Sequence, residues 1–157
     1  MSGFHHRHPG MAVAALAHAE FSEIIPDLLH VHPGAIRAAL RSIPHLYCVT
    51  DATSATGMPD GDYKLGTQIV HKCLGGVRLK DGTLAGSCLT THQAFLNLIQ
   101  IGLTPMEASN RLSQIPANLI GLSHRGRLER DFVSDVLVLN SDFSLKEVYV
   151  EGVKIER

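Results

Sequence analysis

The stretch Val49-Thr50-Asp51-Ala52-Thr53 decides how this chain is interpreted. It overlaps the end of an apolar run over residues 46–50, which follows Pro44, a pattern typical of a buried β-strand. Asp51 therefore comes directly after a strand. Enzymes built on α/β barrels place catalytic acids and bases at the carboxyl ends of strands. We expect Asp51 to be catalytic. The alternative is a structural aspartate whose side chain accepts hydrogen bonds from the backbone of a turn.

The residues before this strand predict one βα unit of a parallel sheet. Residues 21–25 form a short apolar strand, and a helix over residues 34–42 begins with Pro33 in its first turn, where proline is favoured. An Ala-rich helix over residues 11–19 precedes the unit. A complete barrel takes about 250 residues. We therefore expect the carboxyl-terminal part of a barrel, whose open strand edges make a marginal monomer.

After Asp51 the pattern changes to short strands separated by glycines, followed by helices. Asp81-Gly82 is typical of a tight turn. Gly102 ends one helix, and Thr104 with Glu107 forms the capping-box pattern that begins the next. The remaining elements are predicted as strands over residues 63–65, 67–71 and 77–79, helices over residues 90–101 and 116–120, and strands over residues 135–139, 145–150 and 153–155.

The composition excludes several classes of protein. Apolar residues make up 45% of the chain, which is enough for a core, and the formal net charge of -1 gives no basic excess for nucleic acid. No apolar run is long enough to predict a membrane span, and no secretory signal is recognisable, so a cytoplasmic location is expected. The cysteines show no CxxC spacing and are expected to be buried, reduced thiols: Cys48, Cys73 and Cys88.

Six segments occur in an order that resembles the carboxyl-terminal portion of N-acetylglucosamine-6-phosphate deacetylases, a family of the amidohydrolase superfamily. They are His5-His6-Arg7-His8-Pro9-Gly10, His30-Val31-His32-Pro33, residues 49–53, Gly82-Thr83-Leu84-Ala85-Gly86-Ser87, Pro116-Ala117 with Gly121-Leu122, and residues 134–139. The resemblance extends over essentially the whole chain. No single segment is specific, but their common order is.

The resemblance implies a role for each matching residue. Asp51 matches the catalytic aspartate, and Arg7 matches a basic residue that binds the 6-phosphate. His30, with Asp27 before it, matches the stretch that contacts the sugar. The positions that match a loop lining the substrate pocket are Leu84, Ala85 and Gly86.

The resemblance also implies a divalent metal, zinc or a similar ion, in the complete enzyme. The family's metal ligands lie on the N-terminal side of the Arg7 region, so none is assigned here and no metal is expected on this chain alone. His30 and His32 flank one residue and are a possible pair, but a third ligand is not evident. Metal lowers the pKa of bound water, and a carboxylate such as Asp51 can then pass the water's proton to the leaving nitrogen.

The fold class implied is α/β: the last one or two βα units of a metal-dependent (β/α)8 TIM barrel over residues 1–122, and strands of a small β-sandwich over residues 123–157. The expected function is part of a deacetylase that converts N-acetylglucosamine 6-phosphate to glucosamine 6-phosphate and acetate. The expected partners are this sugar phosphate and a missing N-terminal half or a second copy. The alternatives are a non-catalytic sugar-phosphate-binding module and a fragment of another amidohydrolase.

Overall fold

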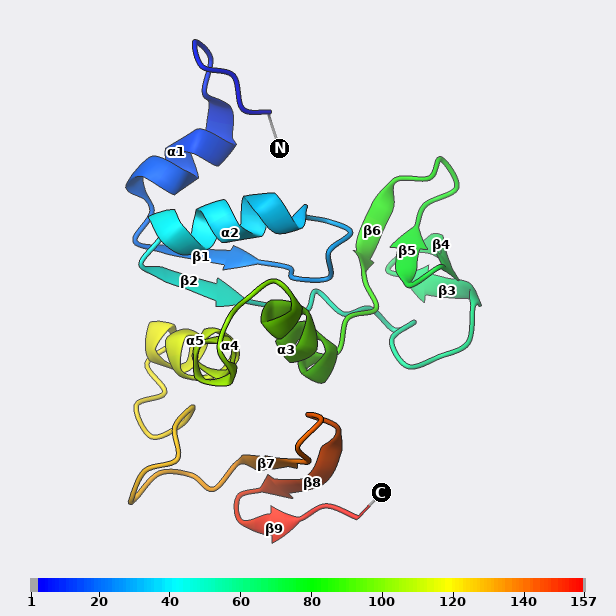
Figure 1. Cartoon of the computed structure of the whole chain (residues 1–157). Coiled ribbons are helices and arrows are strands. Elements are labelled where there is room, and N and C mark those ends of the chain that lie inside the picture. The colour runs from blue at the N-terminus through cyan, green and yellow to red at the C-terminus, as the bar shows by residue number, and fades with distance from the viewer. Residues whose placement is uncertain (1–2, 157) are drawn as a thin grey trace.

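The computed structural model describes residues 3–156, which form mixed α/β structure with three separate sheets (Figure 1). The helices are α1 (Gly10–His18), α2 (Pro33–Ser42), α3 (Thr91–Gln100), α4 (Pro105–Leu112) and α5 (Gln114–Leu119). The strands are β1 (Phe21–Ile24), β2 (His45–Cys48), β3 (Gly61–Leu65), β4 (Gln68–Cys73), β5 (Gly76–Arg78), β6 (Leu84–Ser87), β7 (Val136–Leu139), β8 (Leu145–Val150) and β9 (Val153–Lys154).

The predicted βα unit is confirmed. β1 and β2 pair in parallel, with Ile24 opposite Cys48, and α2 connects them. Local sequence explains the helix: His32 caps its start by accepting a hydrogen bond from the Gly34 amide at 3.1 Å, and Pro33 follows. The capping box of α4 is also confirmed, because Glu107 and Thr104 each accept a hydrogen bond from the other's backbone amide.

The antiparallel strands correct one prediction. β3, β4, β5 and β6 form one sheet, and β7, β8 and β9 form another. We expected Leu84, Ala85 and Gly86 to lie in a loop, and this was wrong: they belong to strand β6, which pairs with β5. Small residues with weak strand propensity depend on their partners for this structure, and those partners are distant in the sequence.

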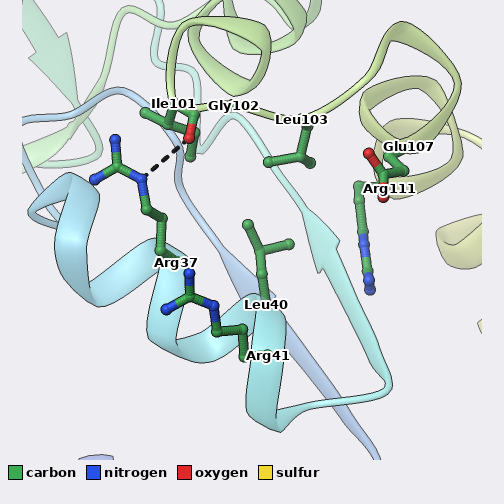
Figure 2. Close-up of a pocket in the computed structure, with 8 residues that line it drawn as sticks. All are labelled: Arg37, Leu40, Arg41, Ile101, Gly102, Leu103, Glu107 and Arg111. Atoms are coloured by element: carbon green, nitrogen blue, oxygen red, sulfur yellow. Dashed lines mark hydrogen bonds between the residues drawn. The ribbon is translucent and has the colours of Figure 1, made fainter.

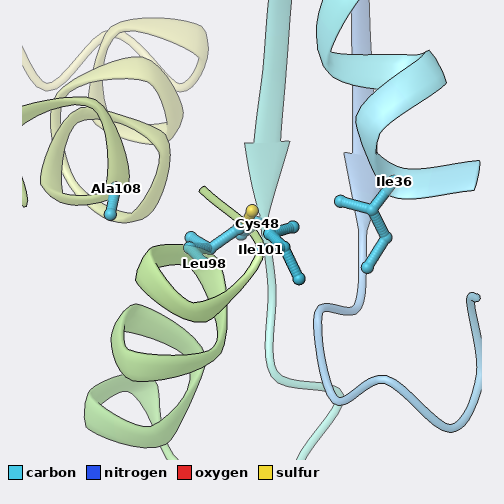
Figure 3. Packing of buried hydrophobic residues seen from close by; sticks show 5 residues of the cluster. All are labelled: Ile36, Cys48, Leu98, Ile101 and Ala108. Atoms are coloured by element: carbon cyan, nitrogen blue, oxygen red, sulfur yellow. The ribbon is translucent and has the colours of Figure 1, made fainter. Parts of the chain in front are cut away.

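The main core lies on one face of the β1–β2 sheet. Leu46 and Cys48 of β2 are 1% and 5% exposed and pack against residues of the helices. Cys48 packs in a cluster with Ile36 of α2, Leu98 of α3 and neighbouring residues (Figure 3). Side chains alternate across a strand, so His45 and Tyr47 belong to the opposite face. That face carries no buried residue of β1 or β2, and Tyr47 donates a hydrogen bond there to Glu23 at 3.3 Å.

The same sheet has an open edge. Within residues 3–156, β1 pairs with β2 alone, so its other side presents unpaired backbone groups. A hollow of about 320 Å³ lies over the helix-side face of this region, lined by apolar groups of α1, β1, α2 and the loop before α2 that include Leu16, Ile24 and Val31. Parallel strands are normally buried on both faces, whereas here one face is uncovered and, within residues 3–156, no further strand pairs with either outer edge.

The three cysteines are free, and only one of them is buried. Cys48 is buried, whereas Cys73 and Cys88 are half-buried, which corrects the expectation of three buried thiols. Burial raises the pKa of the Cys48 thiol to about 12, against a smaller lowering effect of Arg111. Because folding raises this pKa, the neutral thiol contributes stability that is lost as the pH rises above the unfolded value of about 8.5.

We expect Cys48 to react with iodoacetamide at least about a hundredfold more slowly than Cys73 near pH 8, since thiolate is the reactive form. Modification of each cysteine is measured over time by mass spectrometry of peptides. Denaturant supplies the control, because unfolding should bring the two rates together. Equal rates in native buffer would contradict the burial of Cys48.

Candidate active site

Asp51 lies just beyond β2, at the end of the parallel sheet where the carboxyl ends of β1 and β2 lie. Its side chain is exposed and its backbone is left-handed, with φ of 49°. A short parallel bridge between Ala52 and Ser87 joins this segment to the end of β6. The Ser87 amide donates to the Asp51 carbonyl at 2.8 Å, and the Thr53 amide donates to the Ser87 carbonyl at 3.0 Å. The backbone on both sides of Asp51 is therefore held by one residue.

The side chain of Ser87 strengthens this junction. Ser87 is 1% exposed, and its hydroxyl donates to the Thr50 carbonyl while accepting from the Leu89 amide at 3.0 Å. The Thr53 hydroxyl donates in turn to the Ser87 carbonyl at 3.2 Å. Buried hydrogen bonds of this kind hold a backbone conformation because leaving either partner unsatisfied costs about 1–3 kcal/mol.

Gly86 lies closer to Thr53, two residues after Asp51, than any other residue type could. Its φ is 77°, and a Cβ at this position would lie 2.6 Å from Cγ2 of Thr53 and 3.6 Å from Oδ2 of Asp51. The first distance is shorter than carbon atoms tolerate. Glycine is therefore required here both for its backbone conformation and for the space.

Asp27 and His30 form a hydrogen-bonded pair after β1. Nδ1 of His30 lies 2.6 Å from Oδ2 of Asp27, and the side chains are 19% and 7% exposed. Oδ1 of Asp27 accepts from the backbone amides of Leu29 and His30 at 3.0 and 2.9 Å. Since a carboxylate only accepts, Nδ1 carries the proton, and Nε2 of a neutral ring is left as an acceptor.

These groups converge on one end of the sheet. β1 and β2 are parallel, so the segments that follow them, which carry His30 and Asp51, begin at the same end of the sheet. A Cβ at Gly76 would lie 3.5 Å from Leu29 and 3.4 Å from Leu84, which places the loop after β1 against β5 and β6. Six of the predicted positions thus belong to this end of the sheet: Asp27, His30, Asp51, Leu84, Ala85 and Gly86. Leu84 and Ala85 are half-buried there.

Arg7 makes no side-chain hydrogen bond or ion pair with the residues of this region. It lies in the exposed segment before α1, and its backbone amide donates to Nδ1 of His5 at 3.3 Å. Within residues 3–156, its guanidinium has neither a hydrogen bond nor an ion pair. The contact of Arg7 with a phosphate remains a prediction.

The side chains present do not fit the divalent metal that the resemblance implies. Among residues 3–156, no three His, Cys, Asp or Glu side chains gather in a way that could hold an ion. Nδ1 of His30 is engaged by Asp27, and Nδ1 of His32 caps α2, so these two histidines have separate structural uses.

Sequence reasoning missed Ser87 and Asn97. Ser87 ends one of the segments that resemble the family, but no role was predicted for it. Asn97 of α3 is 7% exposed and donates to the Pro26 carbonyl at 2.9 Å, which supports the residue before Asp27. A polar residue within the apolar pattern of α3 was the signal that could have found Asn97.

Comparison with known proteins decides the family. No protein-family model matches the chain. A putative N-acetylgalactosamine-6-phosphate deacetylase of Escherichia coli K12 is 36% identical, over 97% of this chain and 93% of its own length. The N-acetylglucosamine-6-phosphate deacetylase of Vibrio furnissii is 40% identical over 97% of this chain. The chain belongs to the N-acetylglucosamine-6-phosphate deacetylase family.

Solved structures of N-acetylglucosamine-6-phosphate deacetylases share its fold. The Thermotoga maritima enzyme superimposes with a TM-score of 0.91 at 31% identity, covering 99% of this chain and 44% of that one. An Asp-to-Ala mutant of the Mycobacterium smegmatis deacetylase, in complex with N-acetyl-D-glucosamine-6-phosphate, gives 0.89 at 31% identity over 98% of this chain and 42% of that one. The chain also spans only 39% of the Vibrio furnissii deacetylase. None of the helices in residues 3–156 has the length and apolar character that a membrane crossing needs.

Proposed function

We propose that the chain is the carboxyl-terminal part of a cytoplasmic N-acetylglucosamine-6-phosphate deacetylase and supplies its general acid and base, Asp51. The observation that carries the proposal is the position of Asp51 beyond β2, where Ser87 holds its backbone, at the same end of the parallel sheet as the Asp27–His30 pair. In this proposal residues 1–122 are the last βα units of a TIM barrel, and residues 123–157 are strands of a small β-sandwich.

Each group has a definite task in amide hydrolysis. The Asp51 carboxylate accepts the proton of the attacking water and passes it to the leaving nitrogen, so that the products are an amine and acetate. Nε2 of His30 accepts a hydrogen bond from the sugar, and Asp27 keeps the ring in the tautomer that this requires. Leu84, Ala85 and Gly86 line the sugar, and Arg7 binds the 6-phosphate through its planar fork.

We infer that the active enzyme needs a complementing segment. The uncovered face and edge of the β1–β2 sheet support this, because a closed barrel would pair and bury both. The segment would also bring the metal site, for which residues 3–156 have no ligand set. A second copy of the chain would cover the sheet without adding new ligand types.

The test joins the chain to the part of the Vibrio furnissii deacetylase that it does not match, and this fusion is called the chimera below. Release of acetate is measured from N-acetylglucosamine 6-phosphate and from N-acetylgalactosamine 6-phosphate. We expect turnover by the chimera, with preference for the glucosamine sugar, and none by the chain alone. Turnover by the chain alone, with bound metal, would overturn the need for a complement.

The same measurement distinguishes a catalytic deacetylase from a non-catalytic binding module. A folded chimera that binds the sugar phosphate without releasing acetate would establish a binding module and contradict the catalytic proposal. A chimera that prefers the galactosamine sugar would keep the reaction but reassign the substrate, as the name of the Escherichia coli relative suggests for that protein.

A further inference from the structure

Three arginines line one cavity at the opposite end of the sheet from Asp51. The cavity, of about 280 Å³, lies between α2, the turn after α3 and α4. Figure 2 shows Arg37 and Arg41 on α2, with Arg111 and Glu107 on the facing helix and Leu40 and Leu103 between them. Nη1 of Arg111 donates to the carbonyls of Pro44 and Leu46, which places the cavity beside the start of β2.

Two of these guanidinium groups are held in place by the backbone. Nε of Arg37 donates to the Ile101 carbonyl at 3.1 Å, drawn as the dashed line in Figure 2. Arg111 uses Nη1 for its two carbonyls, at 3.0 and 2.8 Å. The Nη groups of Arg37, and Nε with Nη2 of Arg111, stay available as donors. Groups that are already ordered lose less entropy when they bind an anion.

The positive charge of the cavity is not balanced. Within residues 3–156, Arg37, Arg41 and Arg111 have no ion pair, and Arg41 has no hydrogen bond. The single carboxylate of the lining is Glu107, whose Oε2 accepts from the amide and hydroxyl of Thr104 at 2.8 and 2.7 Å. The lining therefore carries three cations and one anion, in a chain whose formal net charge is -1. Such an excess of positive charge favours the binding of an anion.

We propose that this cavity is a second anion site, which binds a small phosphate-bearing molecule independently of the deacetylase reaction. Arginine forks match the oxygens of a phosphate group and bind it with two parallel hydrogen bonds. The apolar surface of Leu40 and Leu103 accommodates a small organic body beside the phosphate. The volume lies near the lower end of the range of about 300–1,000 Å³ for small-molecule sites, which restricts the ligand to a small metabolite or the free ion.

The experiment titrates the 157-residue chain with inorganic phosphate and with glycerol 3-phosphate, and sodium chloride keeps the ionic strength constant. Nε–H signals of arginine are followed by NMR, and a thermal melt is recorded in parallel. We expect the signals of Arg37 and Arg111 to move and the melting temperature to rise, because a ligand of the native state stabilises it. Tighter binding of glycerol 3-phosphate would identify a phosphate ester, and equal binding would identify the free ion.

Two variants distinguish phosphate binding at this cavity from a general effect of the net charge. Arg41→Gln removes a cation that holds no structural contact, and Arg130→Gln makes the same charge change at a side chain that is 94% exposed. We expect Arg41→Gln to weaken phosphate binding about fivefold, as for a partly exposed charge pair of about 1 kcal/mol. Arg130→Gln should leave it unchanged. No phosphate-dependent shift, or equal losses in Arg41→Gln and Arg130→Gln, would overturn the proposal.

Discussion

Asparagine in place of Asp51 is expected to lower the kcat of the chimera by about 10²–10⁴-fold and to leave KM close to that of the parent. The amide cannot accept the proton of the attacking water, whereas its size is nearly the same as that of the carboxylate. Asparagine also tolerates the left-handed backbone at this position, where φ is 49°. The loss is therefore chemical, and the fold should persist.

Asp131→Asn is the matched control. Asp131 has φ of 68° and a side chain that is 90% exposed, so the substitution makes the same change of charge in the same backbone region. Acetate release and binding of the sugar phosphate are measured for both variants. We expect Asp131→Asn to stay within about twofold of the parent, as surface substitutions usually do. An Asp51→Asn chimera within about threefold of the parent would return Asp51 to a structural role.

The parts of the fold that local signals encode were predictable. β1, α2 and β2 follow from short apolar runs between prolines, and the capping box of Thr104 and Glu107 is written in four consecutive residues. Proline and N-cap residues act on the backbone beside them, so their effect does not depend on distant contacts. The same is true of Asp51, whose place after a strand could be inferred from its neighbours.

The parts that depend on distant partners could not be predicted. β6 becomes a strand because β5 and the segment after β2 supply its hydrogen bonds, and Leu84, Ala85 and Gly86 show no strand pattern of their own. Asp27 and His30 were proposed together, but the hydrogen bond between their side chains was not foreseen.

The arginine cavity is another feature that depends on residues distant in the sequence. Arg37 and Arg41 are one helical turn apart and look like ordinary solvated charges in the sequence. Arg111 joins them only because α2 and α4 pack on the same sheet, with Ile101 and Gly102 turning the chain between α3 and α4. Arg111 is about seventy residues from Arg41 in the sequence, and no local pattern links residues so far apart. The cluster arises from the packing of the helices.

The junction that holds Asp51 is open to a direct steric test at Gly86. Alanine there would place its Cβ 2.6 Å from Cγ2 of Thr53, a methyl group that cannot swing away while the hydroxyl donates to Ser87. Gly57 has the same φ of 77° with no atom within 4 Å of its Cβ position, so Gly57→Ala carries the backbone cost alone. We expect Gly86→Ala to lower the free energy of unfolding by about 1–3 kcal/mol more than Gly57→Ala does.

Removing the clashing methyl should rescue the variant. Thr53→Ser keeps the hydroxyl that donates to Ser87 but lacks Cγ2. Denaturant unfolding of the chimera is measured for Gly86→Ala, Thr53→Ser and the double variant, which forms a double-mutant cycle. We expect the double variant to recover most of the excess destabilisation, and with it the acetate release that depends on the position of Asp51. Additive losses would mean that the Thr53 methyl is not the contact that makes glycine necessary at position 86.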